Sequence, residues 1–67
     1  MHLDTEALHS KLAALTQEHR ELDAAISALM QESSYDQFRV SRMKKRKLLI
    51  KDMISRINSQ LIPDLNA

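Results

Sequence analysis

The fold is decided first by residues 8–29, which read LHSKLAALTQEHRELDAAISAL. Leucine and isoleucine recur there in alternating steps of four and three residues when His19 is counted with them. This spacing places one stripe along a helix and is typical of the seam of a coiled coil. The stripe consists of Leu8, Leu12, Leu15, His19, Leu22, Ile26 and Leu29.

A second seam lies in residues 40–61, which read VSRMKKRKLLIKDMISRINSQL. Its steps alternate between three and four residues when Lys47 is included. Its members are Val40, Met43, Lys47, Ile50, Ile54, Ile57 and Leu61. Each seam therefore contains one polar residue in an otherwise apolar row.

The segment between the seams is expected to form a turn. Ser34 and Gln37 have the spacing of a capping box, in which the hydroxyl accepts a hydrogen bond from the backbone N–H three residues on. Asp4 or Thr5 is expected to cap the first helix. Pro63 disfavours a helical conformation at the residue before it, so the second helix should end near Leu61.

These signals predict a single domain over residues 1–67, which is a helical hairpin. We expect a first helix over about residues 5–32, a turn over about 33–35, a second helix over about 35–61 and a C-terminal tail over 62–67.

Folding the chain at the turn brings the two seams into register. Paired positions then sum to 69, and each layer joins position a of one helix to position d of the other. The layers are Leu8 with Leu61, Leu12 with Ile57, Leu15 with Ile54, His19 with Ile50, Leu22 with Lys47, Ile26 with Met43, and Leu29 with Val40. The predicted fold class is all-α, an antiparallel two-helix coiled-coil hairpin.

The polar residues in and beside the seam are expected to set this register. Asp23 comes opposite Lys44 and close to Lys47, whose amine should reach it while the stem packs in the seam. Glu32 comes opposite Arg39. We interpret His19 as a partly buried residue that holds register, with a pH switch or a metal ligand as the alternative. For Lys47 the alternative is an anion-binding role.

Composition narrows the function. The chain has no Cys and no Gly, which removes disulfides, thiolate metal sites and glycine-rich phosphate loops. Residues 1–34 carry six acidic and two basic side chains, whereas residues 35–67 carry three acidic and eight basic ones. We see no signal peptide and no apolar run of membrane-spanning length, and expect a cytoplasmic protein without cofactors. A two-helix hairpin offers no water-excluding cleft, so we do not expect an enzyme.

One flank of the predicted hairpin is apolar. Ala14, Ala25, Ala28, Leu49 and Met53 fall at heptad positions c and g, which lie toward one side. Because small chains rarely obtain enough stability from one core, we predict that two hairpins bury these flanks together in a four-helix bundle.

A basic run extends from Arg39 to Lys51. Of its members, Arg42, Lys45, Arg46 and Lys51 are the candidate contacts to a polyanion such as nucleic acid. On a helix these side chains spread around the circumference, and no aromatic platform accompanies them. Elsewhere, Leu48, Ile62 and Phe38 lie away from the apolar flank, as a docking patch for another protein or as scattered exposed residues.

The residues also resemble a known family. Residues 19–26, HRELDAAI, and residues 43–54, MKKRKLLIKDMI, resemble the two segments that mark the YdcH-like family of short bacterial proteins. Met43 and Ile50 replace the usual leucines, and Met53 stands where an acid is common. The resemblance covers about residues 8–57. It implies a cytoplasmic helical hairpin of unknown function and no reaction.

We therefore predict a non-enzymatic helical interaction or adaptor protein that is homo-oligomeric. Its protein partner is not identified by the sequence, and no membrane association is expected. A small basic nucleic-acid-associated protein that uses the Arg39–Lys51 run is the alternative.

Overall fold

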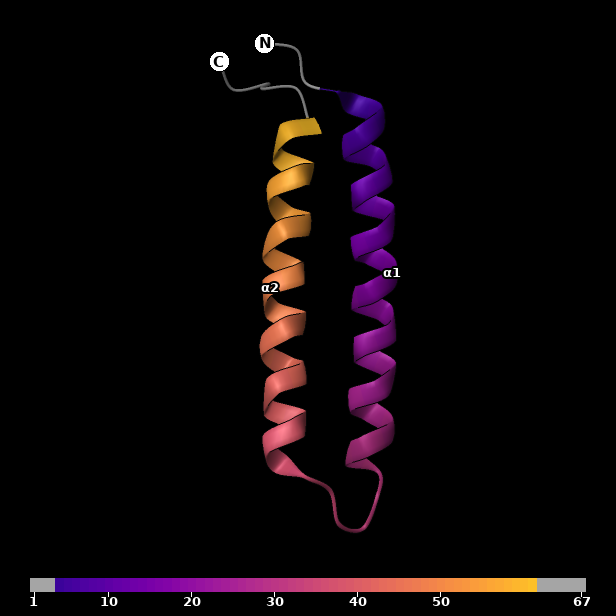
Figure 1. The fold of residues 1–67 in the computed structure, drawn as a ribbon, viewed down its shortest axis with the longest axis vertical. Helices are drawn as coiled ribbons and strands as arrows, with labels where there is room; N and C mark the ends of the chain where they lie inside the picture. The colour runs from indigo at the N-terminus through magenta and orange to yellow at the C-terminus, as the bar shows by residue number, and fades with distance from the viewer. Residues whose placement is uncertain (1–3, 62–67) are drawn as a thin grey trace.

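The computed structural model describes residues 4–61, which form two antiparallel α-helices joined by a short turn (Figure 1). Helix α1 spans Thr5–Met30 and helix α2 spans Gln37–Leu61. The helices lie side by side along their length, so the predicted all-α hairpin is confirmed. The predicted tail lies outside the described residues. Within residues 4–61, neither helix contains a stretch that is both long and apolar enough to cross a membrane.

Helix α1 begins at the cap that the sequence indicates. The Asp4 carboxylate accepts a hydrogen bond from the N–H of Ala7 at 3.1 Å, which satisfies a backbone donor in the first turn. At the other end, the N–H groups of Gln31 and Glu32 bond to carbonyls of the last turn at 3.3 and 3.1 Å. The α-helix thus ends at Met30, slightly before the predicted end near residue 32.

The predicted cap of helix α2 is wrong. Asp36, rather than Ser34, caps this helix, because its Oδ1 accepts hydrogen bonds from the N–H groups of Phe38 at 2.9 Å and Arg39 at 3.2 Å. Its carbonyl accepts from the N–H of Val40 at 3.1 Å. A carboxylate also interacts favourably with the positive end of the helix dipole. The helix therefore begins at Gln37 rather than near residue 35.

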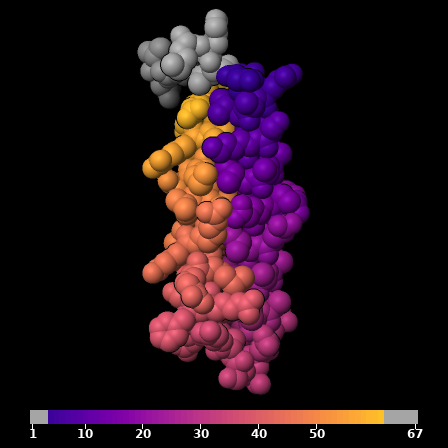
Figure 2. All heavy atoms as spheres, in the orientation of Figure 1, coloured from indigo at the N-terminus to yellow at the C-terminus, as the bar shows by residue number. Residues whose placement is uncertain are grey.

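The core is a single line of side chains between the helices. The buried apolar residues in the described part of the chain all belong to the predicted seams: Leu15, Ile26, Val40, Ile50 and Ile57. Ile50 is fully buried, at 0 % exposure. Leu15, Ile50 and Ile57 form one cluster, and the half-buried side chains packed on it are Leu8, Leu12, Leu22, Met53, Ile54 and Leu61. Figure 2 shows the atoms of the two helices meeting along the rod on the face in view.

Candidate interaction surfaces

The two edges of the hairpin carry different side chains. In an antiparallel pair, positions c and g of both helices lie toward one edge, and positions b and e lie toward the other. We call the first edge the Met53 flank; it contains Ala14, Ala25, Ala28, Leu49 and Met53. We call the second edge the Lys44 flank; on helix α2 it contains Gln37, Ser41, Lys44, Leu48 and Lys51.

An ion pair across the helices marks the Lys44 flank. Lys47 is half-buried in the seam, and its Nζ donates a hydrogen bond to Asp23 Oδ1 at 2.9 Å, which is the contact that the sequence predicts. This hydrogen bond and the charge of Lys47 hold the pKa of Asp23 below its ordinary value, and His19 acts in the same direction. His19 is itself half-buried in the seam. That these residues set the register stays a prediction.

Two other predicted pairings are wrong. Within residues 4–61, Asp23 pairs with Lys47 and not with Lys44, and no ion pair joins Glu32 to Arg39. Lys47 has the more direct route to the carboxylate, because its stem runs between the helices. Glu32 lies beyond the end of helix α1, so a helical position no longer determines where its side chain points.

Arg46 forms an interaction that the sequence reasoning missed. Its Nε lies 2.9 Å from Glu18 Oε2, across the edge on the Met53 flank. The sequence pattern could have predicted this ion pair, because both residues occupy position g, and g residues of antiparallel helices share an edge. On helix α2, Arg56 pairs with Asp52 at 3.1 Å one turn away. Arg46 is therefore already bound to an acid and is a weaker candidate for a polyanion contact.

The other predicted polyanion contacts remain exposed. Arg42, Lys45 and Lys51 form no ion pair in the part of the chain that the structure describes, and neither does Lys44. Their heptad positions differ, however: Arg42 lies toward the Met53 flank, Lys45 on the outer side of helix α2, and the other two on the Lys44 flank. The structure thus does not gather the basic run into one stripe.

The predicted self-association residues fall into two groups. Met53 and Ala25 are half-buried within the hairpin, and Met53 packs against the core cluster. Ala14, Ala28 and Leu49 are exposed, with Leu49 at 51 %. A shallow, open hollow on this flank is lined by Lys11, Met53, Arg56 and Ile57. Together with the Glu18–Arg46 pair, these charged side chains make the apolar part of the flank narrower than the sequence indicates.

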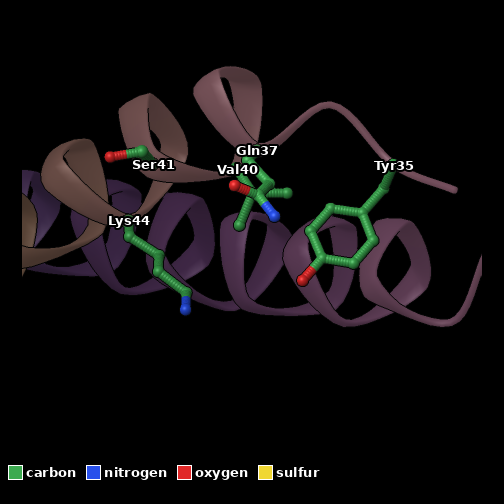
Figure 3. A pocket seen from close by; sticks show the side chains of 5 residues that line it. All are labelled: Tyr35, Gln37, Val40, Ser41 and Lys44. Atoms are coloured by element: carbon green, nitrogen blue, oxygen red, sulfur yellow. The ribbon is translucent and has the colours of Figure 1, made fainter.

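The Lys44 flank has a hollow near the turn that sequence reasoning did not identify (Figure 3). Its lining consists of Tyr35, Gln37, Val40, Ser41 and Lys44, and its volume is about 230 Å³. In Figure 3 the side chains of Tyr35 and Lys44 stand at opposite ends of the hollow, and those of Gln37 and Val40 lie between them. The one sequence feature that could have pointed to this hollow is the single tyrosine of the chain, Tyr35, which lies beside the predicted turn.

The described residues bring no three potential metal ligands together, counting His, Asp and Glu over positions 4–61. His19 stands in the seam, and Asp23, its acidic neighbour on the Lys44 flank, is hydrogen-bonded to Lys47. The surfaces available for binding are the two flanks, which carry exposed apolar side chains with cationic side chains beside them.

Comparison with known proteins places the chain in a family. No curated protein and no solved structure matches it. A family model described as "Protein of unknown function (DUF465)" matches residues 12–58, which include the turn and most of both helices. YdcH-like proteins belong to this family, so the resemblance of the two segments is confirmed. The chain is a member of the DUF465 family of proteins of unknown function.

Proposed function

We propose that this protein is a non-enzymatic, cytoplasmic interaction protein, in which two hairpins associate through their Met53 flanks as a four-helix bundle. The observation that carries the proposal is the contrast between a narrow core and the apolar side chains left exposed on the Met53 flank. Ala14 and Ala28 are exposed there, and Leu49 is 51 % exposed. Burial of these side chains between two hairpins would add apolar packing that the single hairpin lacks.

The size of the core supports self-association. A chain of this length obtains little stability from one core, and this chain has no Cys that could add a disulfide. On the Met53 flank, the exposed Ala14 and Ala28 allow close approach of another helix, and Leu49 supplies a large apolar side chain. In a four-helix bundle the helices pack around a shared apolar core, which would cover these flanks.

The surfaces support a binding role rather than catalysis. The hollows on the two flanks are shallow, whereas general acid–base chemistry needs a site that positions a substrate and excludes water. The shifted pKa of Asp23 is accounted for by its hydrogen bond to Lys47. That pairing stabilises the charged form of the carboxylate, and it favours a structural role for both residues.

Sedimentation equilibrium of matched glutamate variants tests the proposal. The wild-type chain is expected to have twice the monomer mass at micromolar concentration. Leu49→Glu places a charge on the Met53 flank and should yield the monomer mass. Leu48→Glu, the adjacent leucine on the Lys44 flank, is the control and should keep the dimer mass. A wild-type monomer at every concentration, or equal effects of the two substitutions, would contradict the proposal; far-UV circular dichroism verifies that each variant is helical.

Binding to nucleic acid is the second candidate function. The observation in its favour is that Arg42, Lys45 and Lys51 are exposed and form no ion pair within residues 4–61. Fluorescence anisotropy with labelled duplex DNA and single-stranded RNA tests it at low and physiological salt. Contacts to phosphates predict an affinity that falls steeply with salt and falls further in Lys45→Glu. Absence of binding at low salt would exclude this function.

A further inference from the structure

We propose that the Lys44 flank of helix α2 binds an acidic, amphipathic helical segment of another protein. This inference rests on the proposed role as an interaction protein and specifies the partner for the edge that the Met53 flank leaves uncovered. Its basis is a juxtaposition on one edge: a hollow of side-chain size, an exposed leucine, and two lysines with no acidic partner in the described part of the chain.

The hollow is suited to one apolar side chain. Its floor is Val40, which is 5 % exposed and belongs to the seam, and the half-buried ring of Tyr35 forms one wall. Its volume of about 230 Å³ is below the roughly 300–1,000 Å³ of sites that enclose a small molecule. Figure 3 shows that Lys44 forms the wall opposite Tyr35, so a side chain seated there has an amine beside it.

The same edge continues along helix α2 with regular spacing. Ser41, Lys44, Leu48 and Lys51 follow one another in steps of three and four residues, which is the spacing that a second helix packs along. Leu48 is 63 % exposed and stands between the two lysines. The lysines are two turns apart, roughly 10 Å along the helix axis. A partner helix with two acids at that separation and apolar residues on the same face complements this edge.

The local charges favour an acidic partner. Asp23 is the acid that reaches this part of the edge, and its carboxylate is held by Lys47 at 2.9 Å. Lys44 and Lys51 therefore retain their charge without a partner in residues 4–61. A nucleic acid satisfies the amines but offers no aliphatic side chain for the hollow or for Leu48. A bilayer requires a continuous apolar face, whereas on this edge Lys44 lies between the hollow and Leu48.

The test uses a fluorescein-labelled synthetic helical peptide of about 18 residues that presents glutamates seven positions apart between leucines. Its binding to the full chain is followed by fluorescence anisotropy at physiological salt. A peptide with lysine in place of each glutamate, and one with alanine in place of each leucine, should both fail to bind. These two controls separate a requirement for charge from a requirement for apolar packing.

Two adjacent lysines of the hairpin provide the decisive comparison. Lys44→Glu should weaken peptide binding by about tenfold or more, whereas Lys45→Glu, with the same change in net charge on the outer side of the helix, should alter it by less than about twofold. Leu48→Ala should weaken binding by about fivefold. If Lys44→Glu proves less helical by circular dichroism, Lys51→Glu replaces it, with the same expectation.

Several outcomes would overturn the inference. These are equal losses for Lys44→Glu and Lys45→Glu, no binding of the acidic peptide, or tighter binding of single-stranded RNA with the same dependence on Lys44. The Leu49→Glu monomer should still bind the peptide. If the wild-type chain is a dimer but does not bind the peptide, the proposed self-association is supported and only the proposed partner is contradicted. The two proposals can therefore fail separately.

Discussion

The half of the seam far from the turn and the half near it are built differently. Far from the turn, Leu15, Ile50 and Ile57 form a cluster with half-buried leucines, isoleucine and Met53 around it. Near the turn, Ile26 and Val40 are buried outside that cluster. Lys47 stands in the seam of helix α2 between the two halves.

This difference indicates that stability and specificity are located in different parts of the same seam. The large cluster buries most apolar surface and should supply most of the free energy of unfolding. The polar layer at Lys47 contributes little burial, and we expect it to fix which residues face each other, because its amine reaches Asp23. Substitutions in both halves of the seam, at Lys47 and at the cap of helix α2 beside the turn test whether stability and register depend on different residues.

The largest effect is expected from Ile50→Ala, compared with Ile26→Ala. Truncating the fully buried Ile50 should lower the free energy of unfolding by about 4 kcal/mol, and truncating Ile26 should lower it by about 2 kcal/mol, since Ile26 lies outside the core cluster. Urea unfolding followed by circular dichroism at one protein concentration measures both. Equal losses would show that the two halves of the seam contribute alike.

Next in size is the loss of the cap at the turn end of helix α2. Asp36→Ala removes the acceptor for two backbone N–H groups and should cost about 1 kcal/mol. Ser34→Ala is the control, because the structure gives this hydroxyl no capping role, and it should change stability by less than about 0.3 kcal/mol. A larger effect at Ser34 than at Asp36 would restore the capping box expected from the sequence.

Replacing the polar seam residue should have a smaller effect, of opposite sign. Lys47→Met puts an apolar side chain of similar length into the seam, and we expect the melting temperature to rise by about 3 °C. Lys45→Met, on the outer side, should leave it unchanged. Lower stability in Lys47→Met would mean that the ion pair with Asp23 stabilises the hairpin more than the methionine side chain does by packing in the seam.

The smallest effect is the dependence of stability on pH through Asp23. Since its pKa is lowered in the folded state, the contribution is present above the ordinary carboxyl value of about 3.9 and is lost as pH falls below it. The urea midpoint of the wild type should therefore exceed that of Asp23→Asn at pH 7 and approach it below about pH 3. In the Lys47→Met background this difference should vanish at both pH values; its persistence would assign the shift to another group.

The hairpin was predictable from the sequence because burial between two helices follows heptad spacing closely. Each buried residue of the described chain is a seam position, and Lys47 meets Asp23 as predicted. Such positions are fixed by the helical period alone. The family was also recognisable, because the segments that carry the resemblance lie within the matched residues 12–58.

The details that were missed depend on side chains with a choice of partners. Several polar residues near the turn can cap helix α2, and in the structure Asp36 is the residue that accepts the backbone hydrogen bonds. Arg46 is long enough to cross the edge to Glu18, which heptad position alone does not require. The sequence placed Met53 on an exposed flank, yet its flexible side chain packs against the core cluster. The hollow beside Tyr35 arises from where the turn places that ring.

The narrowness of the core has a consequence for how this scaffold can change over evolutionary time. Five of the described side chains are buried, and they occupy one line between the helices. Substitutions elsewhere on the surface typically alter stability by less than about 0.5 kcal/mol. If the flanks bind partners as proposed, the residues that determine folding and the residues that determine recognition lie on different faces of the same two helices. Substitutions could then change the partner preference of either flank while the architecture stays constant.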